Sequence, residues 1–99
     1  MEIKEGEVMT GISDLGGPHM VELHPVFANV KSFGGKALIL TKGNIKVLRS
    51  YSTNVAEFNT KTKKLKIDKR YTTATTNRHV AEFMKQMGFD VKDKAKYLI

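Results

Sequence analysis

The sequence predicts a single α+β domain, in which an antiparallel β-meander of three to four strands packs against one amphipathic helix. Three observations lead to this fold class. Short apolar and alternating segments fill residues 37 to 68, and apolar residues at helical spacing follow at 80 to 87. A chain of 99 residues with 40% hydrophobic content supplies one modest core. We therefore assign residues 21–99 to one domain.

The first twenty residues form an acidic segment that we expect to be a flexible arm. They show no sustained helical or strand period, and Gly16-Gly17-Pro18 interrupts regular structure. Gly17-Pro18-His19-Met20 also resembles a protease remnant followed by a cloning site, and on that alternative the native chain starts at Met20. The segment Val21–His24 then alternates, and Pro25 confines it to an edge strand.

The clearest hairpin lies between residues 37 and 50. Ala37–Leu40 is a continuous apolar run, Lys42-Gly43-Asn44 suits a tight turn, and the return strand begins at Ile45. From there to residue 58, β-branched and aromatic residues suit either one long bent strand or two strands broken near residues 50 to 53. After a polar turn, Leu65 and Ile67 alternate with lysines, which predicts a further strand with these two residues in the core.

An amphipathic helix is predicted after this strand. Its apolar residues recur at i, i+3, i+4 and i+7, at Val80, Phe83, Met84 and Met87. Thr75 or Thr76 is expected to cap its start, and Gly88 is expected to end it. Residues 90–97 are expected to add a short C-terminal helix.

Charge is distributed unevenly along the chain. The net charge is +7, but residues 1–30 hold one lysine against five acids, a net charge of −4, whereas residues 31–99 carry +11. A body of this charge attracts polyanions, of which nucleic acid is the commonest. The absence of cysteines excludes disulfides and favours an intracellular protein. With no apolar run of roughly 20 residues and no signal-peptide pattern at the N-terminus, we expect a cytoplasmic protein without a membrane partner.

Residue patterns typical of catalysis are missing. His19, His24 and His79 lack the spacing of metal ligands, and Gly34-Gly35 lacks the ending of a phosphate-binding loop. Ser50 and Ser52 have no nucleophile-elbow context. We therefore expect a protein that is not an enzyme and that uses no cofactor or metal.

A basic hairpin is the densest chemical feature, and it predicts a surface that follows phosphates. The predicted nucleic-acid-binding residues are Lys61, Lys63, Lys64, Lys66, Lys69 and Arg70, with Arg78 nearby. The alternative is a solvated strand face whose lysines discourage edge-to-edge pairing.

The threonine-rich segment before the helix predicts a second, smaller anion site. Thr75, Thr76 and His79 could hold a phosphate or carboxylate at the helix start, with Tyr51 as an exposed aromatic platform for a nucleotide. The alternative is that the threonines only cap the helix, while His79 bonds to the preceding strand.

The segments 48–56 and 73–83 resemble a family of small bacteriophage and prophage proteins of unknown function. The first reads Ser-Tyr-x-Thr-x-Val-Ala from Ser50, and the second carries Thr-Thr-x-Arg-His-Val-x-x-Phe from Thr75. Tyr71 departs from the family pattern, which has a tyrosine directly before the position of Thr73. The resemblance implies a phage or mobile-element accessory gene in a bacterial host and brings no catalytic residues with it.

These observations lead to one functional hypothesis and two alternatives. The leading hypothesis is a non-enzymatic accessory protein that binds nucleic acid or another polyanion through the basic hairpin. The alternatives are an inhibitor that contacts a host defence protein directly, and a protein that sequesters a small nucleotide. The oligomeric state stays open, and a homodimer is one option.

Overall fold

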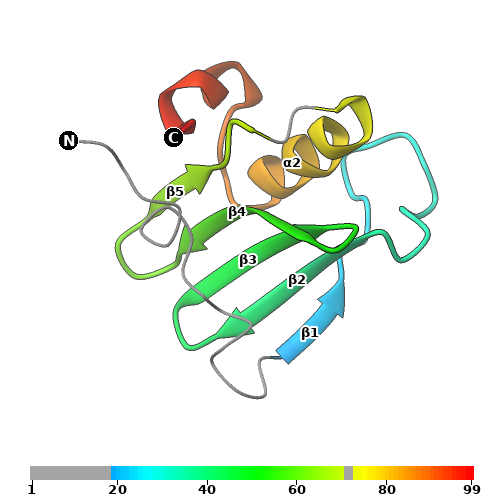
Figure 1. Cartoon of the computed structure of the whole chain (residues 1–99), viewed down its shortest axis with the longest axis horizontal. Helices are drawn as coiled ribbons and strands as arrows, with labels where there is room; N and C mark the ends of the chain where they lie inside the picture. Colours follow the sequence, from blue (N-terminus) through cyan, green and yellow to red (C-terminus); the bar gives the residue numbers. More distant parts are fainter. Residues whose placement is uncertain (1–18, 71–72) are drawn as a thin grey trace.

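The computed structural model describes residues 19–70 and 73–99, in which five strands form one antiparallel sheet with a helix on one face (Figure 1). The strands lie in the sheet in chain order: β1 (His19–Glu22), β2 (Ala37–Lys42), β3 (Ile45–Ser50), β4 (Thr53–Asn59) and β5 (Lys64–Ile67). The helix α2 (Ala74–Gln86) packs on β3 and β4, and a 3-10 helix, η2 (Val91–Tyr97), follows it. The predicted α+β class is confirmed, but the sheet has five strands where three to four were predicted. Residues 1–18 of the predicted arm, and Tyr71, lie outside the described residues.

The additional strand comes from the β3–β4 hairpin. Residues 45 to 59 form two strands joined by the two-residue turn Tyr51-Ser52, rather than one bent strand. Tight hairpin turns of this kind place a residue at positive φ and normally use Gly, Asn or Asp there. In this turn the positive φ belongs to Tyr51, at +58°. The alternative of two strands broken near residues 50 to 53 is therefore correct, although the turn carries none of the residues that usually mark one.

The main core lies between α2 and the sheet. From the sheet it takes Ile39, Leu48, Val55, Ala56, Phe58, Leu65 and Ile67, and from the helix Val80, Phe83 and Met84. A second apolar cluster, around Leu40 and Val47, lies apart from this core. Because β2 contributes neighbouring residues to both clusters, its sequence is a continuous apolar run rather than an alternating one.

The ends of the helix agree with the prediction at one terminus only. Thr73 caps the start, where its side-chain oxygen accepts a hydrogen bond from the backbone N–H of Thr76 at 3.2 Å, so the predicted caps Thr75 and Thr76 are wrong. Thr73, Thr75 and Thr76 lie close together in the sequence, and each side chain is chemically able to cap the helix start. Gly88 ends the helix as predicted, with φ at +91°. The predicted C-terminal helix is η2, capped by Asp90.

The side chain of Glu82 joins α2 to the connection between β1 and β2. Its carboxylate accepts hydrogen bonds from the backbone N–H groups of Val26 at 2.8 Å, Phe27 at 3.1 Å and Ala28 at 2.8 Å. Gln86 donates to the same carboxylate and to a backbone carbonyl of the connection. Burial to 2% exposure raises the pKa of Glu82, but these hydrogen bonds outweigh it and hold the pKa below its ordinary value. The carboxylate therefore fixes a segment that has no helix or strand of its own.

We predict that Glu82→Gln destabilises the protein by about 2–4 kcal/mol at pH 7, because hydrogen bonds to a charged acceptor are replaced by weaker ones around a buried group. Denaturant unfolding measures this difference. Since the folded-state pKa is lowered, the stabilisation by the carboxylate is present above the ordinary pKa of glutamate, about 4.3, and is lost as the pH falls through the folded-state pKa. The two proteins should therefore converge in stability in acid.

Glu22→Gln on β1 is the matched control, because Glu22 is half-buried and makes no comparable set of contacts. It should change stability by no more than about 0.5 kcal/mol. Equal effects of the two substitutions would show that the three amide contacts of Glu82 contribute little.

Candidate functional site

Two neighbouring turns lie at one end of the sheet (Figure 1). Both carry exposed lysines. The β2–β3 turn and the β4–β5 turn are joined because the backbone N–H and the hydroxyl of Thr60 both donate to the carbonyl oxygen of Asn44, at 2.8 and 3.2 Å. Together they carry four exposed lysines, Lys42, Lys61, Lys63 and Lys64. We call these four residues the basic end.

Local hydrogen bonds fix the shape of the β4–β5 turn. The side-chain oxygen of Asn59 accepts from the backbone N–H groups of Lys61 at 2.9 Å and Thr62 at 3.0 Å, as asparagine commonly does in turns. Lys63 adopts a positive φ of +63° and donates its N–H to the carbonyl of Asn59. Within the described residues, Lys61, Lys63 and Lys64 take part in no ion pair. The turn therefore holds three charged side chains outward on an ordered backbone.

The other predicted cations of the basic hairpin lie elsewhere. Lys66 is half-buried on β5, and Lys69 and Arg70 follow the opposite end of that strand. Arg70 is bound to Asp68 through two nitrogens, the closer one at 2.6 Å, and this contact lowers the pKa of Asp68 although burial raises it. Arg78 lies on α2. The structure thus gathers only part of the predicted set at the basic end and adds Lys42, which sequence spacing did not connect to it.

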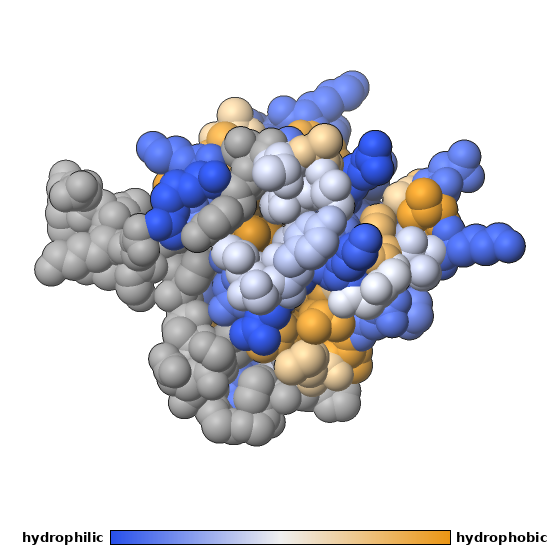
Figure 2. All heavy atoms as spheres, turned by 45° about the vertical axis from the view of Figure 1, so that its right-hand side comes forward, coloured by the Kyte–Doolittle hydropathy of each residue, from blue (hydrophilic) through white to orange (hydrophobic). Residues whose placement is uncertain are grey.

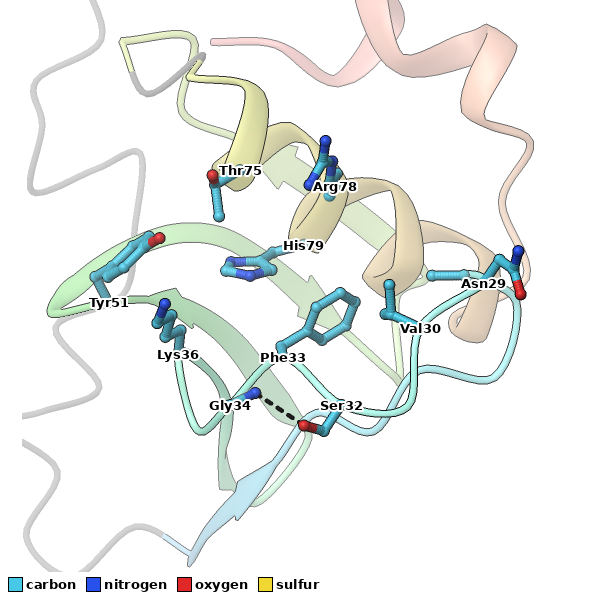
Figure 3. Close-up of a pocket in the computed structure, with 11 residues that line it drawn as sticks. Asn29, Val30, Ser32, Phe33, Gly34, Lys36, Tyr51, Thr75, Arg78 and His79 are labelled. Atoms are coloured by element: carbon cyan, nitrogen blue, oxygen red, sulfur yellow. Dashed lines mark hydrogen bonds between the residues drawn. The ribbon is translucent and has the colours of Figure 1, made fainter.

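A pocket of about 720 Å³ lies at the β3–β4 turn, at the opposite end of the sheet from the basic end (Figure 3). The β1–β2 connection, the β3–β4 turn and the first half of α2 form its walls. They carry two cations, three rings and a hydroxyl, from Lys36, Arg78, Phe33, Tyr51, His79 and Thr75. We call this space the Tyr51 pocket. Among residues 19–70 and 73–99, no aspartate or glutamate lines it.

His79 forms the inner wall of the Tyr51 pocket and is held by a buried polar network. Its Nδ1 lies 2.7 Å from the hydroxyl oxygen of Ser50, which in turn lies 3.2 Å from the hydroxyl oxygen of Thr76. Burial, and to a lesser degree the nearby charge of Lys36, lower the pKa of His79, so the ring is neutral at neutral pH. Nε2 has no hydrogen-bond partner among the described residues, in which every fully buried polar side-chain atom has one. Nε2 therefore reaches the pocket surface.

Tyr51 stands at the mouth of the pocket in a strained conformation. A positive φ costs a residue with a Cβ atom roughly 1–2 kcal/mol. The conformation is held by a 2.7 Å hydrogen bond from the Tyr51 N–H to the carbonyl of Lys36. The ring centre lies 6.0 Å from that of His79 and 5.9 Å from the ammonium of Lys36 (Figure 3). Strain of this kind is typically kept where a side chain must point in one direction.

The structure brings the residues of the predicted smaller anion site together. Tyr51, Thr75 and His79 all line the pocket, while Thr76 lies behind it in the hydrogen-bonded network with Ser50. His79 bonds to β3 rather than to the strand that precedes the helix. Three of the four predicted residues thus share one cavity.

Sequence reasoning missed the contribution of the β1–β2 connection. Lys36 and Phe33 enter the pocket from this segment, and the ring of Phe33 meets that of His79 edge-on at 4.8 Å. The available signal was Gly34-Gly35, whose positive φ values of +63° and +73° turn the chain between these two residues. The turn places Phe33 against His79 of α2, more than 40 residues away in sequence, and this contact cannot be read from the glycines themselves.

The geometry favours binding over group transfer at the Tyr51 pocket. Ser50 and His79 are close enough for a nucleophile and a base, but Ser50 is only 2% exposed and a substrate cannot reach its oxygen.

Across residues 19–70 and 73–99, no cluster of three or more potential metal ligands occurs, and no helix is long and apolar enough to cross a membrane.

We predict that Tyr51→Gly leaves the free energy of unfolding unchanged or raises it by up to about 1 kcal/mol. Glycine adopts a positive φ without strain, and the ring is 51% exposed, so little packing is removed. Thermal or urea unfolding tests this expectation.

Ser52→Gly is the control in the same turn. Ser52 does not have a positive φ, so glycine there should only increase the freedom of the unfolded chain and lower stability by about 0.4–1 kcal/mol. A loss of stability in Tyr51→Gly larger than that in Ser52→Gly would contradict the strain described for Tyr51.

Comparison with known proteins places the chain among sequences of undetermined role. It matches none of the curated proteins and none of the solved structures. Residues 21–98 match the model of a family of unknown function, DUF8033, which covers the described sheet from Val21 onward and both helices. The chain therefore belongs to the DUF8033 family.

Proposed function

We propose that this protein binds nucleic acid, or another polyanion, through the basic end. The observation that carries the proposal is the pair of hydrogen bonds between Thr60 and Asn44, which join two hairpin turns. Four exposed lysines from separate parts of the chain thereby share one surface. Each phosphate neutralised by such a lysine releases a counterion and adds salt-dependent, sequence-independent affinity.

Acidic residues of the domain are far fewer than its lysines and arginines. Glu57 and Glu82 are buried on the domain, and Asp68 is paired with Arg70. Asp93 is paired with Lys96 in η2. Residues 31–99 therefore keep a net charge of +11 after all five of their acidic residues are counted.

The wider setting is part of the same proposal. A small accessory protein of a phage or mobile element, acting without catalysis in the cytoplasm of a bacterial host, would meet abundant nucleic acid there. A steered, low-specificity contact with phosphates needs no deep cleft and suits a domain of 99 residues.

Direct contact with a host protein is the second candidate, and one surface favours it. The β1–β2 connection exposes Val26, Phe27 and Val30 to 70%, 55% and 52% of their surface. Figure 2 brings this side of the molecule forward and shows hydrophobic and hydrophilic residues intermingled on it. The hydrogen bonds to Glu82 hold part of this segment in place, which lowers the ordering cost of a protein contact.

Replacement of Lys61, Lys63 and Lys64 by glutamine tests the leading proposal. Fluorescence anisotropy with a labelled duplex should show binding at about 50 mM salt that weakens steeply toward 200 mM. The triple variant should flatten the plot of log K against log salt concentration by about 0.9 for each phosphate that is no longer neutralised.

Replacement of Lys31, Lys85 and Lys92 by glutamine is the matched control, because these lysines are also exposed and the net charge changes equally. The control should keep nearly the full slope. Equal reductions in both variants would show that only net charge matters, and undetectable binding of the unaltered protein at about 50 mM salt would rule the proposal out.

A further inference from the structure

We propose that the Tyr51 pocket is a separate binding site for a small anion that carries a flat ring, a mononucleotide being the simplest ligand of this class. The inference does not depend on the basic end, because the two lie at opposite ends of the sheet. It rests on the lining of the cavity and on the strained residue at its mouth.

The charge of the pocket favours an anion. Lys36 and Arg78 both line it, no acidic residue does, and neither cation takes part in an ion pair within the described part of the chain. Lys36 is close enough to His79 to influence its ionisation. Two cations in one concave site, with no counter-charge from the described residues, leave a positive potential that a phosphate or carboxylate would neutralise.

The rings of the pocket favour a planar ligand. Phe33 packs edge-on against His79 with ring centres 4.8 Å apart, and Tyr51 lies 6.0 Å from His79 on the other side (Figure 3). About half of the surface of Tyr51 is exposed. Its backbone φ is positive, a conformation that strains tyrosine and would not strain glycine. An exposed aromatic face beside a cation is the kind of surface on which nucleobases stack.

Size and hydrogen bonding agree with this ligand class. A pocket of about 720 Å³ lies within the range of roughly 300–1,000 Å³ that small-molecule sites occupy. Thr75 and Ser32, which both line the pocket, contribute hydroxyl groups. These two groups can bond to heteroatoms of the ring or sugar while the cations hold the anionic group.

Isothermal titration calorimetry with the four ribonucleoside monophosphates, the corresponding nucleosides and inorganic phosphate tests the proposal on the full chain. At least one monophosphate should bind with saturation below about 1 mM, and its nucleoside and free phosphate should each bind at least about tenfold more weakly. A nucleoside or phosphate that binds as tightly as the monophosphate would overturn the combined anion-and-ring assignment. So would the absence of binding by all four monophosphates.

Variants locate the site. Tyr51→Gly and Arg78→Gln should each weaken monophosphate binding by about tenfold, because the first removes the stacking ring and the second removes a positive charge. Tyr51→Gly is informative because it is expected to keep the fold stable, which the same unfolding measurement verifies. The triple lysine variant of the basic end should bind the monophosphate as the unaltered protein does. Loss of binding in that variant, with retention in Tyr51→Gly, would place the nucleotide at the basic end and contradict the proposal.

Discussion

The buried carboxylate of Glu82 is the contact on which the arrangement of this domain depends most. The connection between β1 and β2, residues 23–36, contains no helix or strand, so some of its backbone N–H groups, those of Val26, Phe27 and Ala28 among them, have no partner in regular secondary structure. Glu82 accepts three of them and is itself satisfied by them. Helix, connection and sheet thereby become one unit, because each end of this segment is also tied to a strand.

The same stripe of α2 shapes the Tyr51 pocket. Thr76, His79, Glu82 and Gln86 recur every three or four residues, so they lie on one side of the helix and face β3 and the β1–β2 connection. One end of the stripe forms the pocket wall and the other end anchors the segment that carries Phe33 and Lys36. The basic end uses none of these contacts, since its turns are held by hydrogen bonds of Asn59 and Thr60 and by the pairing of the strands that they join. The domain thus separates a pocket that depends on tertiary structure from a surface built by local turns.

Local signals predict much of the fold and little of the pocket. The β2–β3 hairpin follows from Lys42-Gly43-Asn44, and the helix follows from its apolar spacing. The break at Tyr51 is only one of two alternatives that the sequence allows, because a tyrosine at positive φ is stabilised by a distant carbonyl rather than by its own chemistry. Glu82 resembles a solvent-exposed helix position until its amide partners, 54 to 56 residues away, are known. Long-range contacts of this kind leave no periodicity in the sequence.

Hydrogen exchange at the backbone amides of Val26, Phe27 and Ala28 tests the central role of Glu82 most directly. The side chains of Val26 and Phe27 are well exposed, and among the described residues the Glu82 carboxylate is the hydrogen-bond acceptor of their amides. The structure predicts exchange far slower than in an unstructured peptide and close to that of the α2 amides. Exchange at the rate of an unstructured loop would show that the carboxylate does not hold the connection, and the Tyr51 pocket would then lack a fixed wall.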